Sequence, residues 1–194
     1  MALVRILKLI MVCVLTTSAA GAFAFEIEKV NFPDQVERGG QKLQLNGAGL
    51  RNKRKLGMQF RVYVAALYTV EKSSDAKAVI GADSPKELRL HFLRAVDADT
   101  LREAWTEGYG KNCADTCATT ADQLKAFNSA MADVRDGSTI TMRFGKDKVA
   151  VETDGKEKKS AEIAGADFHK NLLAVFIGDN PPTEELKKGL LGVK

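Results

Sequence analysis

Alternating apolar and polar residues predict strands in the first half of the chain. The strongest pattern lies at residues 58–70, MQFRVYVAALYTV, which is rich in the β-branched and aromatic residues that strands favour. Its expected core face consists of Met58, Phe60, Val62 and Val64. Tyr63 is then expected on the opposite face with Gln59 and Arg61, because successive side chains of a strand point to opposite sides.

Weaker patterns predict three more strands around this one. Residues 25–30 indicate a first strand and residues 43–45 a second, with a tight turn at Gly39-Gly40 between them. Residues 87–96 (ELRLHFLRAV) alternate again, and we expect leucines and a phenylalanine on the core side of that strand.

After residue 96, the apolar residues recur at the spacing that is typical of helices. Asp97 or Asp99 can cap a first helix, which ends near Gly108 or Gly110. A second helix is expected to start at a Thr-x-x-Gln capping box at residues 120–123 and to run to Gly137. The chain therefore carries two helices joined by a loop that contains two cysteines.

The second half of the chain predicts a meander of three strands followed by helices. The strand sequences STITMRF, KVAVET and SAEI are separated by GKD and DGKEKK turns. A helix at residues 166–177 ends at Gly178, and Pro181-Pro182 precedes a short terminal helix. Strands and helices in separate blocks favour an α+β fold, with a mainly antiparallel sheet covered by helices.

The N-terminus has the features of a secretory signal peptide. Arg5 and Lys8 precede the apolar run LIMVCVL, and Ala22 and Ala24 form an A-x-A cleavage pattern. The apolar run is shorter than the roughly 20 residues of a membrane span, and no other segment is long enough. We expect cleavage after Ala24, one domain at residues 25–194, and a periplasmic or secreted protein.

Charge and cysteine usage narrow the possible functions. The formal charge of +4 falls to +2 when Arg5 and Lys8 are removed, which argues against nucleic-acid binding. In an oxidising compartment Cys113 and Cys117 are expected to form a disulfide. The alternatives are free thiols and a metal site. A metal needs two more ligands, and the spacing brings neither histidine of the chain there.

Common catalytic templates are missing from the sequence. There is no nucleophile elbow, no phosphate-binding glycine loop and no cluster of metal ligands. We therefore expect no metal and no cofactor, and any catalysis would depend on undemanding acid–base chemistry.

One segment resembles a known family. Residues 47–68 read G-A-G-L-R and, after a spacer, V-Y-V-A-A-L-Y. They resemble the part of the chalcone isomerase family in which a glycine-flanked arginine precedes a strand ending in Val/Leu-Tyr. The order of the later blocks is similar over most of the chain, and LLAVFIGDNPP is a weaker match. The resemblance implies an open-faced β-sandwich, a large antiparallel sheet layered against helices, with a cleft between them.

The resemblance also implies a range of functions. Plant members close a hydroxychalcone into a flavanone without a cofactor, whereas other members bind fatty acids or assist partner enzymes, and some bacterial relatives are exported. The arginine of the family falls on Arg51, and the threonine of the plant enzymes falls on Tyr63. The catalytic tyrosine and asparagine would lie within residues 96–107, which contain neither. The position that senses substrate falls near His169.

Three hypotheses follow from these observations. The first is an exported, non-catalytic binder of a small acidic apolar ligand such as a fatty acid, with Arg51, Tyr63 and His169 as its candidate contacts. The second is an isomerase, an intramolecular lyase of the chalcone type. The third is a ligand-free interaction protein of the cell envelope. Arg51 and Tyr63 also have interpretations without a binding role: Arg51 can be a solvated charge at a hairpin turn, and Tyr63 can be an ordinary sheet residue. A hairpin that turned at residues 52–57 would leave the two far apart.

Overall fold

The computed structural model describes residues 23–55 and 57–193. The predicted signal segment, apart from Phe23 and Ala24, lies outside the described residues. No described helix is long and apolar enough to cross a bilayer.

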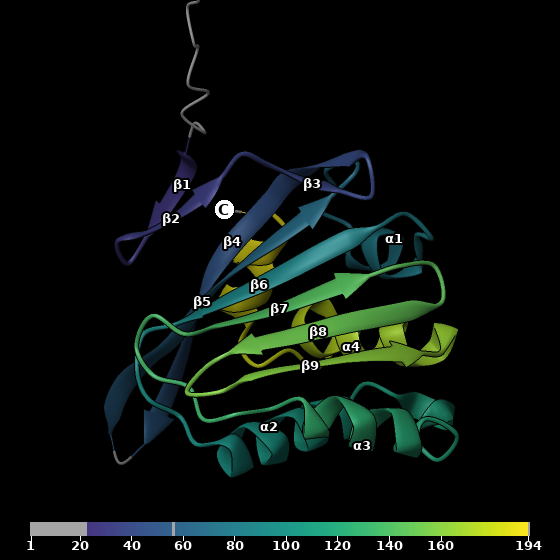
Figure 1. The fold of residues 1–194 in the computed structure, drawn as a ribbon. Coiled ribbons are helices and arrows are strands. Elements are labelled where there is room, and N and C mark those ends of the chain that lie inside the picture. The colour runs from purple at the N-terminus through teal and green to yellow at the C-terminus, as the bar shows by residue number, and fades with distance from the viewer. Residues whose placement is uncertain (1–22, 56, 194) are drawn as a thin grey trace, which may run out of the picture.

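A seven-stranded antiparallel sheet forms the centre of the molecule, with its strands adjacent in chain order (Figure 1). These strands are β3 (Gln35–Arg38), β4 (Gln41–Lys55), β5 (Met58–Thr69), β6 (Lys86–Phe92), β7 (Thr139–Phe144), β8 (Lys148–Asp154) and β9 (Lys158–Ala164). The predicted meander is therefore confirmed as β7 to β9. Short turns suffice to connect most of these strands, because antiparallel neighbours need no crossover.

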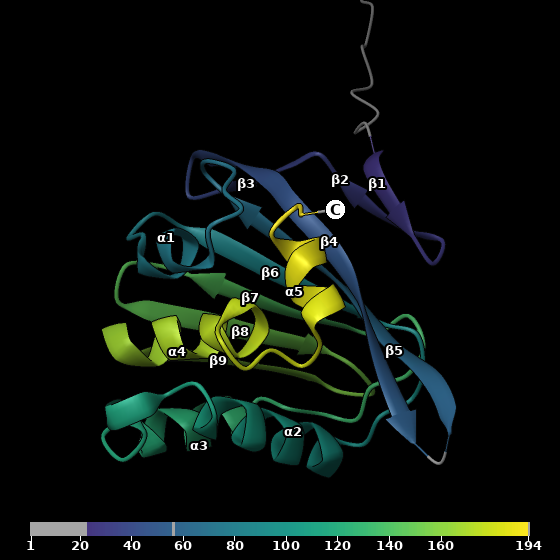
Figure 2. The same ribbon diagram turned by 180° about the vertical axis from the view of Figure 1, so that it is seen from behind.

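Helices cover one face of this sheet. They are α1 (Ala76–Gly81), α2 (Ala98–Gly110), α3 (Ala121–Ser129), α4 (Ala166–Ile177) and α5 (Glu184–Leu190). Figure 2 shows α4 and α5 in front of the strands, with α2 and α3 along the lower edge. The main core lies between the sheet and these helices and includes Leu90, Trp105, Phe127 and Phe176. The architecture is the predicted α+β fold.

The opposite face of the sheet is only partly covered. A separate two-stranded sheet, β1 (Phe23–Ile27) and β2 (Val30–Pro33), lies beside β4, and a second small core forms there around Leu43 and Tyr68. In Figure 1 no helix lies on the outer side of β6 to β9. This one-sided cover is the open-faced arrangement that the resemblance implies.

The N-terminal strand differs from the prediction. Residues 25–30 do not form one strand, because Glu28 and Lys29 take positive φ values of 52° and 65° and reverse the chain between β1 and β2. Alternation of side chains continues on both sides of such a tight turn, so the pattern alone does not reveal it.

The second predicted helix also differs at both ends. Thr120 lies at the N-cap position of α3 but makes no capping bond. Its hydroxyl instead donates to the Thr116 carbonyl at 2.6 Å and accepts from the Tyr109 hydroxyl at 2.7 Å. The helix ends at Ser129 rather than near Gly137, because Val134 pairs with Val96 as an isolated bridge. Tertiary partners therefore override the local helical pattern.

Candidate functional site

A β-bulge in β5 creates the most distinctive feature of the sheet. Arg51 is paired with Tyr63 and Asn52 with Arg61, so Val62 has no partner on β4. The Val62 carbonyl accepts instead from the Leu93 amide at 2.9 Å. An extra residue on one strand shifts the alternation, and side chains on its two sides exchange faces.

The bulge corrects the predicted faces of β5. Phe60, Val62 and Tyr63 line one pocket on the helical side, whereas Val64 belongs to the small core on the opposite side. The sequence pattern predicted Tyr63 opposite Phe60, which is wrong. A period of two residues cannot indicate a bulge, because the extra residue is defined only by the partner strand.

Arg51 and Tyr63 lie directly across from each other. The strand β4 continues to Lys55 and β5 begins at Met58, and Arg51 and Tyr63 are register partners. The condition that would have left them apart, a hairpin turn spread over residues 52–57, is therefore not met, because residues 52–55 belong to β4. Arg51 is a half-buried strand residue, not a turn residue, and it lines the same pocket as Tyr63.

The glycines before Arg51 explain how closely α5 approaches β4. A Cβ on Gly47 would lie 2.2 Å from the Gly189 carbonyl oxygen, and one on Gly49 would lie 2.8 Å from that of Leu186. Because these glycines lack side chains, α5 packs against the backbone of β4. Arg51 follows two residues after Gly49, and Pro182, just before α5, lies beside it in the pocket wall. The G-A-G-L-R segment therefore combines a helix contact with an arginine at its end.

The pocket has a volume of 730 Å³, within the range of about 300–1,000 Å³ that is usual for small-molecule sites. The hairpin of β4 and β5 and the end of β6 form one wall, and α2, Val175 of α4 and the prolines before α5 form the other. Its apolar lining includes Val62, Phe92, Leu101, Ala104, Trp105 and Val175. The shape and lining suit a molecule with a substantial apolar part.

Arg51 and Tyr63 give the pocket wall a cation and a hydroxyl that face each other across two strands. Arg51 donates to the carbonyl of the neighbouring Asn52, and it forms no ion pair with a carboxylate among the described residues. The Tyr63 hydroxyl also has no hydrogen-bond partner within the described part of the chain. Burial raises the pKa of Tyr63, and the Arg51 charge offsets this only in part, so the phenol remains a proton donor. A half-buried guanidinium without a counter-ion favours an anionic ligand.

The two carboxylates in the pocket wall have other partners. Asp97 is the N-cap of α2 and accepts from the Thr100 amide at 2.7 Å and its hydroxyl at 2.8 Å, and these bonds lower the Asp97 pKa. Glu107 pairs with Lys111 at 2.5 Å, and its pKa is lowered by Lys111. Neither group has the raised pKa that a general acid needs near neutral pH.

Arg94 is a pocket residue that the sequence analysis missed. Its guanidinium carbon lies 4.9 Å from the centre of the Phe60 ring, and it lines both the main pocket and a neighbouring hollow of 550 Å³. The prediction extended the strand through Arg94, but β6 ends at Phe92 and the chain then turns over the pocket rim. An arginine two residues after the last strand residue, Phe92, was the available signal.

His169 is not brought together with Arg51 and Tyr63. It lies in α4, is only 1% exposed, and is not among the residues that line the pocket. Neither ring nitrogen has a hydrogen-bond partner among the described residues, and burial lowers the pKa of the imidazole. The alignment by resemblance placed the residue in the correct helix, but its side chain packs away from the pocket.

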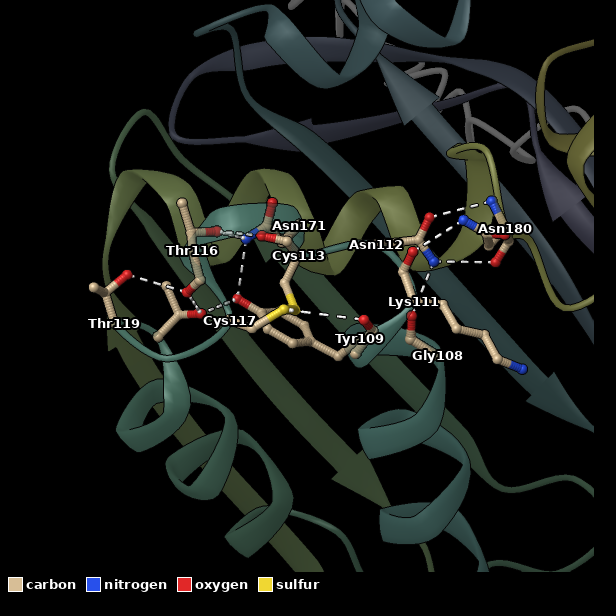
Figure 3. Close-up of a disulfide and its surroundings, with 12 residues drawn as sticks. Gly108, Tyr109, Lys111, Asn112, Cys113, Thr116, Cys117, Thr119, Asn171 and Asn180 are labelled. Atoms are coloured by element: carbon tan, nitrogen blue, oxygen red, sulfur yellow. Dashed lines mark hydrogen bonds between the residues drawn. A yellow bond between two sulfur atoms is a disulfide. The ribbon is translucent and has the colours of Figure 1, made fainter.

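Cys113 and Cys117 form a disulfide in the loop after α2 (Figure 3). Asn171 of α4 donates to the Thr116 hydroxyl at 2.7 Å, inside this loop. Asn112 donates to the carbonyl of Asn180 at 3.0 Å and so connects the loop to the pocket wall. The disulfide thus lies next to the contacts that hold one end of the pocket. No group of three or more potential metal ligands occurs among the described residues.

Comparisons with known proteins agree with this architecture. A family model described as chalcone isomerase-like matches residues 24–192. Among solved structures, the chain is similar to a fatty-acid binding protein of Arabidopsis thaliana, with a TM-score of 0.69 and 18% sequence identity. The match covers 84% of this chain and 92% of that protein. No curated protein matches the sequence. At this identity the structural similarity shows a shared fold.

Proposed function

The chain belongs to the chalcone isomerase-like family, and from this premise we propose that it is an exported, non-catalytic protein that binds a small acidic apolar ligand. A long-chain fatty acid fits this description. The observation that carries the proposal is the half-buried Arg51, which has no carboxylate partner among the described residues and lies across from Tyr63 in the wall of a largely apolar pocket.

Charge and shape of the pocket support this class of ligand. A carboxylate can accept from the guanidinium and from the phenol, and charge-assisted bonds of this kind are short and strong. The hydrocarbon part can then replace water along Leu101, Trp105 and Val175. The similarity to a fatty-acid binding protein of Arabidopsis thaliana is consistent with this assignment.

A chalcone-type isomerase is the second candidate, because Arg51 could stabilise an enolate in the same place. The segment that would supply the catalytic tyrosine and asparagine does line the pocket, but its polar side chains there are Asp97, Thr100 and Glu107. Both carboxylates are held by other groups. An assay of hydroxychalcone cyclisation, followed by the loss of chalcone absorbance, tests this candidate, and we expect no turnover above the rate without protein.

The binding proposal is tested by titration with palmitic acid and its uncharged methyl ester. Trp105 is the single tryptophan of the chain and lines the pocket, so its fluorescence reports occupancy. We expect palmitate to bind about 10- to 100-fold more tightly than the ester, which is the range for a hydrogen bond to a charged group. Arg51→Gln should abolish this preference.

Arg54→Gln is the matched control, because Arg54 belongs to the same hairpin and does not line the pocket. It should bind palmitate like the unchanged protein. If neither compound binds to protein stripped of lipid, the ligand-free interaction protein becomes the better hypothesis. If the ester binds as tightly as the acid, Arg51 is not an anion contact.

Export is tested separately by the intact mass of the protein after expression of the full sequence in a secreting host. We expect a mature chain that begins at Phe25, recovered from the periplasm or the medium. Recovery of the full-length mass in the cytosol would contradict the export proposal without affecting the binding proposal.

A further inference from the structure

The hairpin of β4 and β5 extends beyond the rest of the sheet (Figures 1 and 2). β5 pairs with β6 only from Tyr63 to Thr69, and β4 pairs with β3 only up to Gln44. Residues 52–55 and 58–61 pair with each other, and we call these two stretches the hairpin tip. The tip therefore has a much smaller share of the sheet contacts than the base of the same hairpin.

The hairpin carries positive charge without any acidic residue. Between positions 46 and 70 the sequence contains five cations and no Asp or Glu, and these cations are Arg51, Lys53, Arg54, Lys55 and Arg61. Arg51 lies in the pocket, and Arg61 pairs with Glu28. Arg54 and Lys53 are exposed, and neither forms an ion pair with a described residue. The Lys53 charge helps to lower the pKa of Glu107, whereas the Arg54 charge has no such partner among the described residues and can act on another molecule.

An apolar side chain lies among these cations. Met58 is 58% exposed, which makes it the most exposed of the large hydrophobic side chains in the described part of the chain. It follows Gly57, whose φ of 75° reverses the hairpin. Exposing this side chain at the end of an arm adds nothing to the core of the protein.

We propose that the hairpin tip docks on an anionic lipid bilayer. Arg54 and Lys53 would meet the headgroup phosphates, and Met58 would enter the interface between headgroups and acyl chains. The narrow tip offers little area compared with the 1,200 Å² or so that a stable protein interface buries. Attraction to a charged surface and insertion of a single side chain need no such area, which favours a membrane over an acidic protein.

The position of the tip gives this docking a consequence for the pocket. Lys53 and Phe60 belong to the tip and also line the pocket, so a docked protein would hold this part of the pocket wall next to lipid. Docking itself does not depend on what the pocket binds. It can therefore be tested without a pocket ligand, and its failure is separable from a failure of palmitate binding.

The test is co-sedimentation of the processed protein, purified after expression of the full chain, with two kinds of vesicle. One contains phosphatidylcholine with 30 mol% phosphatidylglycerol, and the other contains phosphatidylcholine alone. We expect binding to the anionic vesicles that weakens as salt is raised, and little binding to the neutral ones. Arg54→Glu and Met58→Asp should each reduce the partition coefficient by about ten-fold or more.

Two control variants make the same chemical changes elsewhere. Lys158→Glu reverses an exposed charge at the start of β9, and Val193→Asp replaces another exposed hydrophobic residue near the C-terminus, far from the tip (Figure 1). Both should partition like the unchanged protein. The proposal is overturned if the protein does not sediment with the anionic vesicles, which is the result expected if the tip recognises an acidic protein instead. It is also overturned if Lys158→Glu weakens vesicle binding as much as Arg54→Glu does.

Discussion

At the scale of single residues, Tyr63 offers the Arg51 site a hydroxyl that is not used by the fold. Its ring packs edge-on against Phe92, with the ring centres 5.6 Å apart, so the aromatic part is held by the core. The hydroxyl lies within the pocket wall and has no partner among the described residues. Removing the Tyr63 hydroxyl should therefore leave the ring contacts with Phe92 in place.

Tyr63→Phe is expected to weaken palmitate binding by about two- to ten-fold, the range for one neutral hydrogen bond. Its melting temperature should change little, because the ring contacts remain. Tyr68→Phe is the matched control, since the Tyr68 hydroxyl is buried without a partner on the opposite face of β5. Titration of both variants with palmitate, followed by Trp105 fluorescence, measures the difference. If Tyr63→Phe and Tyr68→Phe bind palmitate equally well, Tyr63 is not a ligand contact.

Glu87 is a second residue whose surroundings predict a measurable effect. It is fully buried on β6 and accepts from Arg38 of β3 and from Arg89, and Arg143 lies 3.4 Å away. Burial raises the pKa of Glu87, but the bonds and charges of Arg38 and Arg89 outweigh it, so the pKa is lowered. A group of this kind stabilises the fold above its unfolded pKa of about 4.3, and that stability is lost as pH falls through the folded value.

Glu87→Gln should lower the free energy of unfolding at pH 7 by about 3 kcal/mol, since it leaves three guanidiniums without their shared acceptor. The difference from the unchanged protein should shrink as the pH falls through the lowered folded pKa of Glu87, where Glu87 itself takes up a proton. Urea denaturation between pH 3 and pH 7 measures it. Glu162→Gln, in an exposed pair with Lys148, should change stability by less than about 0.5 kcal/mol. A difference that is independent of pH would contradict this account of Glu87.

At the scale of elements, the close contact between α5 and β4 lies near the pocket, since Arg51 of β4 and Pro182 before α5 both line it. Gly47, Gly49 and Gly189 let the two backbones approach without side chains between them. Leu186 and Leu190 of α5 then reach the main core. The helix depends on this contact, because a segment of seven residues is too short to be stable alone.

Gly47→Ala is expected to destabilise the protein by about 1–3 kcal/mol, because the new methyl group would overlap the Gly189 carbonyl and push α5 away. Gly81→Ala in α1 meets no atom within 4 Å and should be neutral or stabilising by up to about 1 kcal/mol. Urea unfolding of the two variants provides the comparison. Equal stabilities would show that α5 can shift at no cost.

At the scale of the whole molecule, the disulfide and the asparagines around it fasten the α2 end to α4 and to the segment before α5. Closing so small a ring is worth about 2 kcal/mol in the loop-entropy model. Replacing Cys113 and Cys117 by alanine should therefore lower the melting temperature by about 4–8 °C. Calorimetry with and without reductant measures this, and reduced protein should melt like the variant.

Neither cysteine lines the pocket, so the palmitate affinity of the double alanine variant should stay within about three-fold of the unchanged protein. A large loss of affinity at unchanged stability would contradict this separation.

Much of the fold was predictable because its signals are local. The strands β7 to β9 follow from alternation and turn residues that lie within a few positions of each other. The helix α4 was predicted at its observed bounds, because its apolar period and the glycine at its end are both contained in the segment. Asp97 was one of two expected caps, and the observed N-cap of α2 is Asp97.

The site was predictable only in part, because its geometry depends on partners that are distant in sequence. Arg51 and Tyr63 were identified by resemblance, but their pairing follows from where the hairpin turns. The face of Tyr63 follows from a bulge that exists only relative to β4. Arg94 was missed, and His169 was placed in the right helix but points elsewhere, since the rotation of a helix against its neighbours is a packing outcome.

The sequence by itself determined most of the strand and helix segments and the α+β class, and it favoured the disulfide, since each depends on side-chain period or spacing within a short stretch. Only the tertiary structure decided the bulge at Val62, the approach of α5 to the glycines of β4, and the pocket between the β4–β5 hairpin and α2. The physical reason is that strand register and close backbone contact are properties of pairs of segments. Such pairs meet only when the chain is folded.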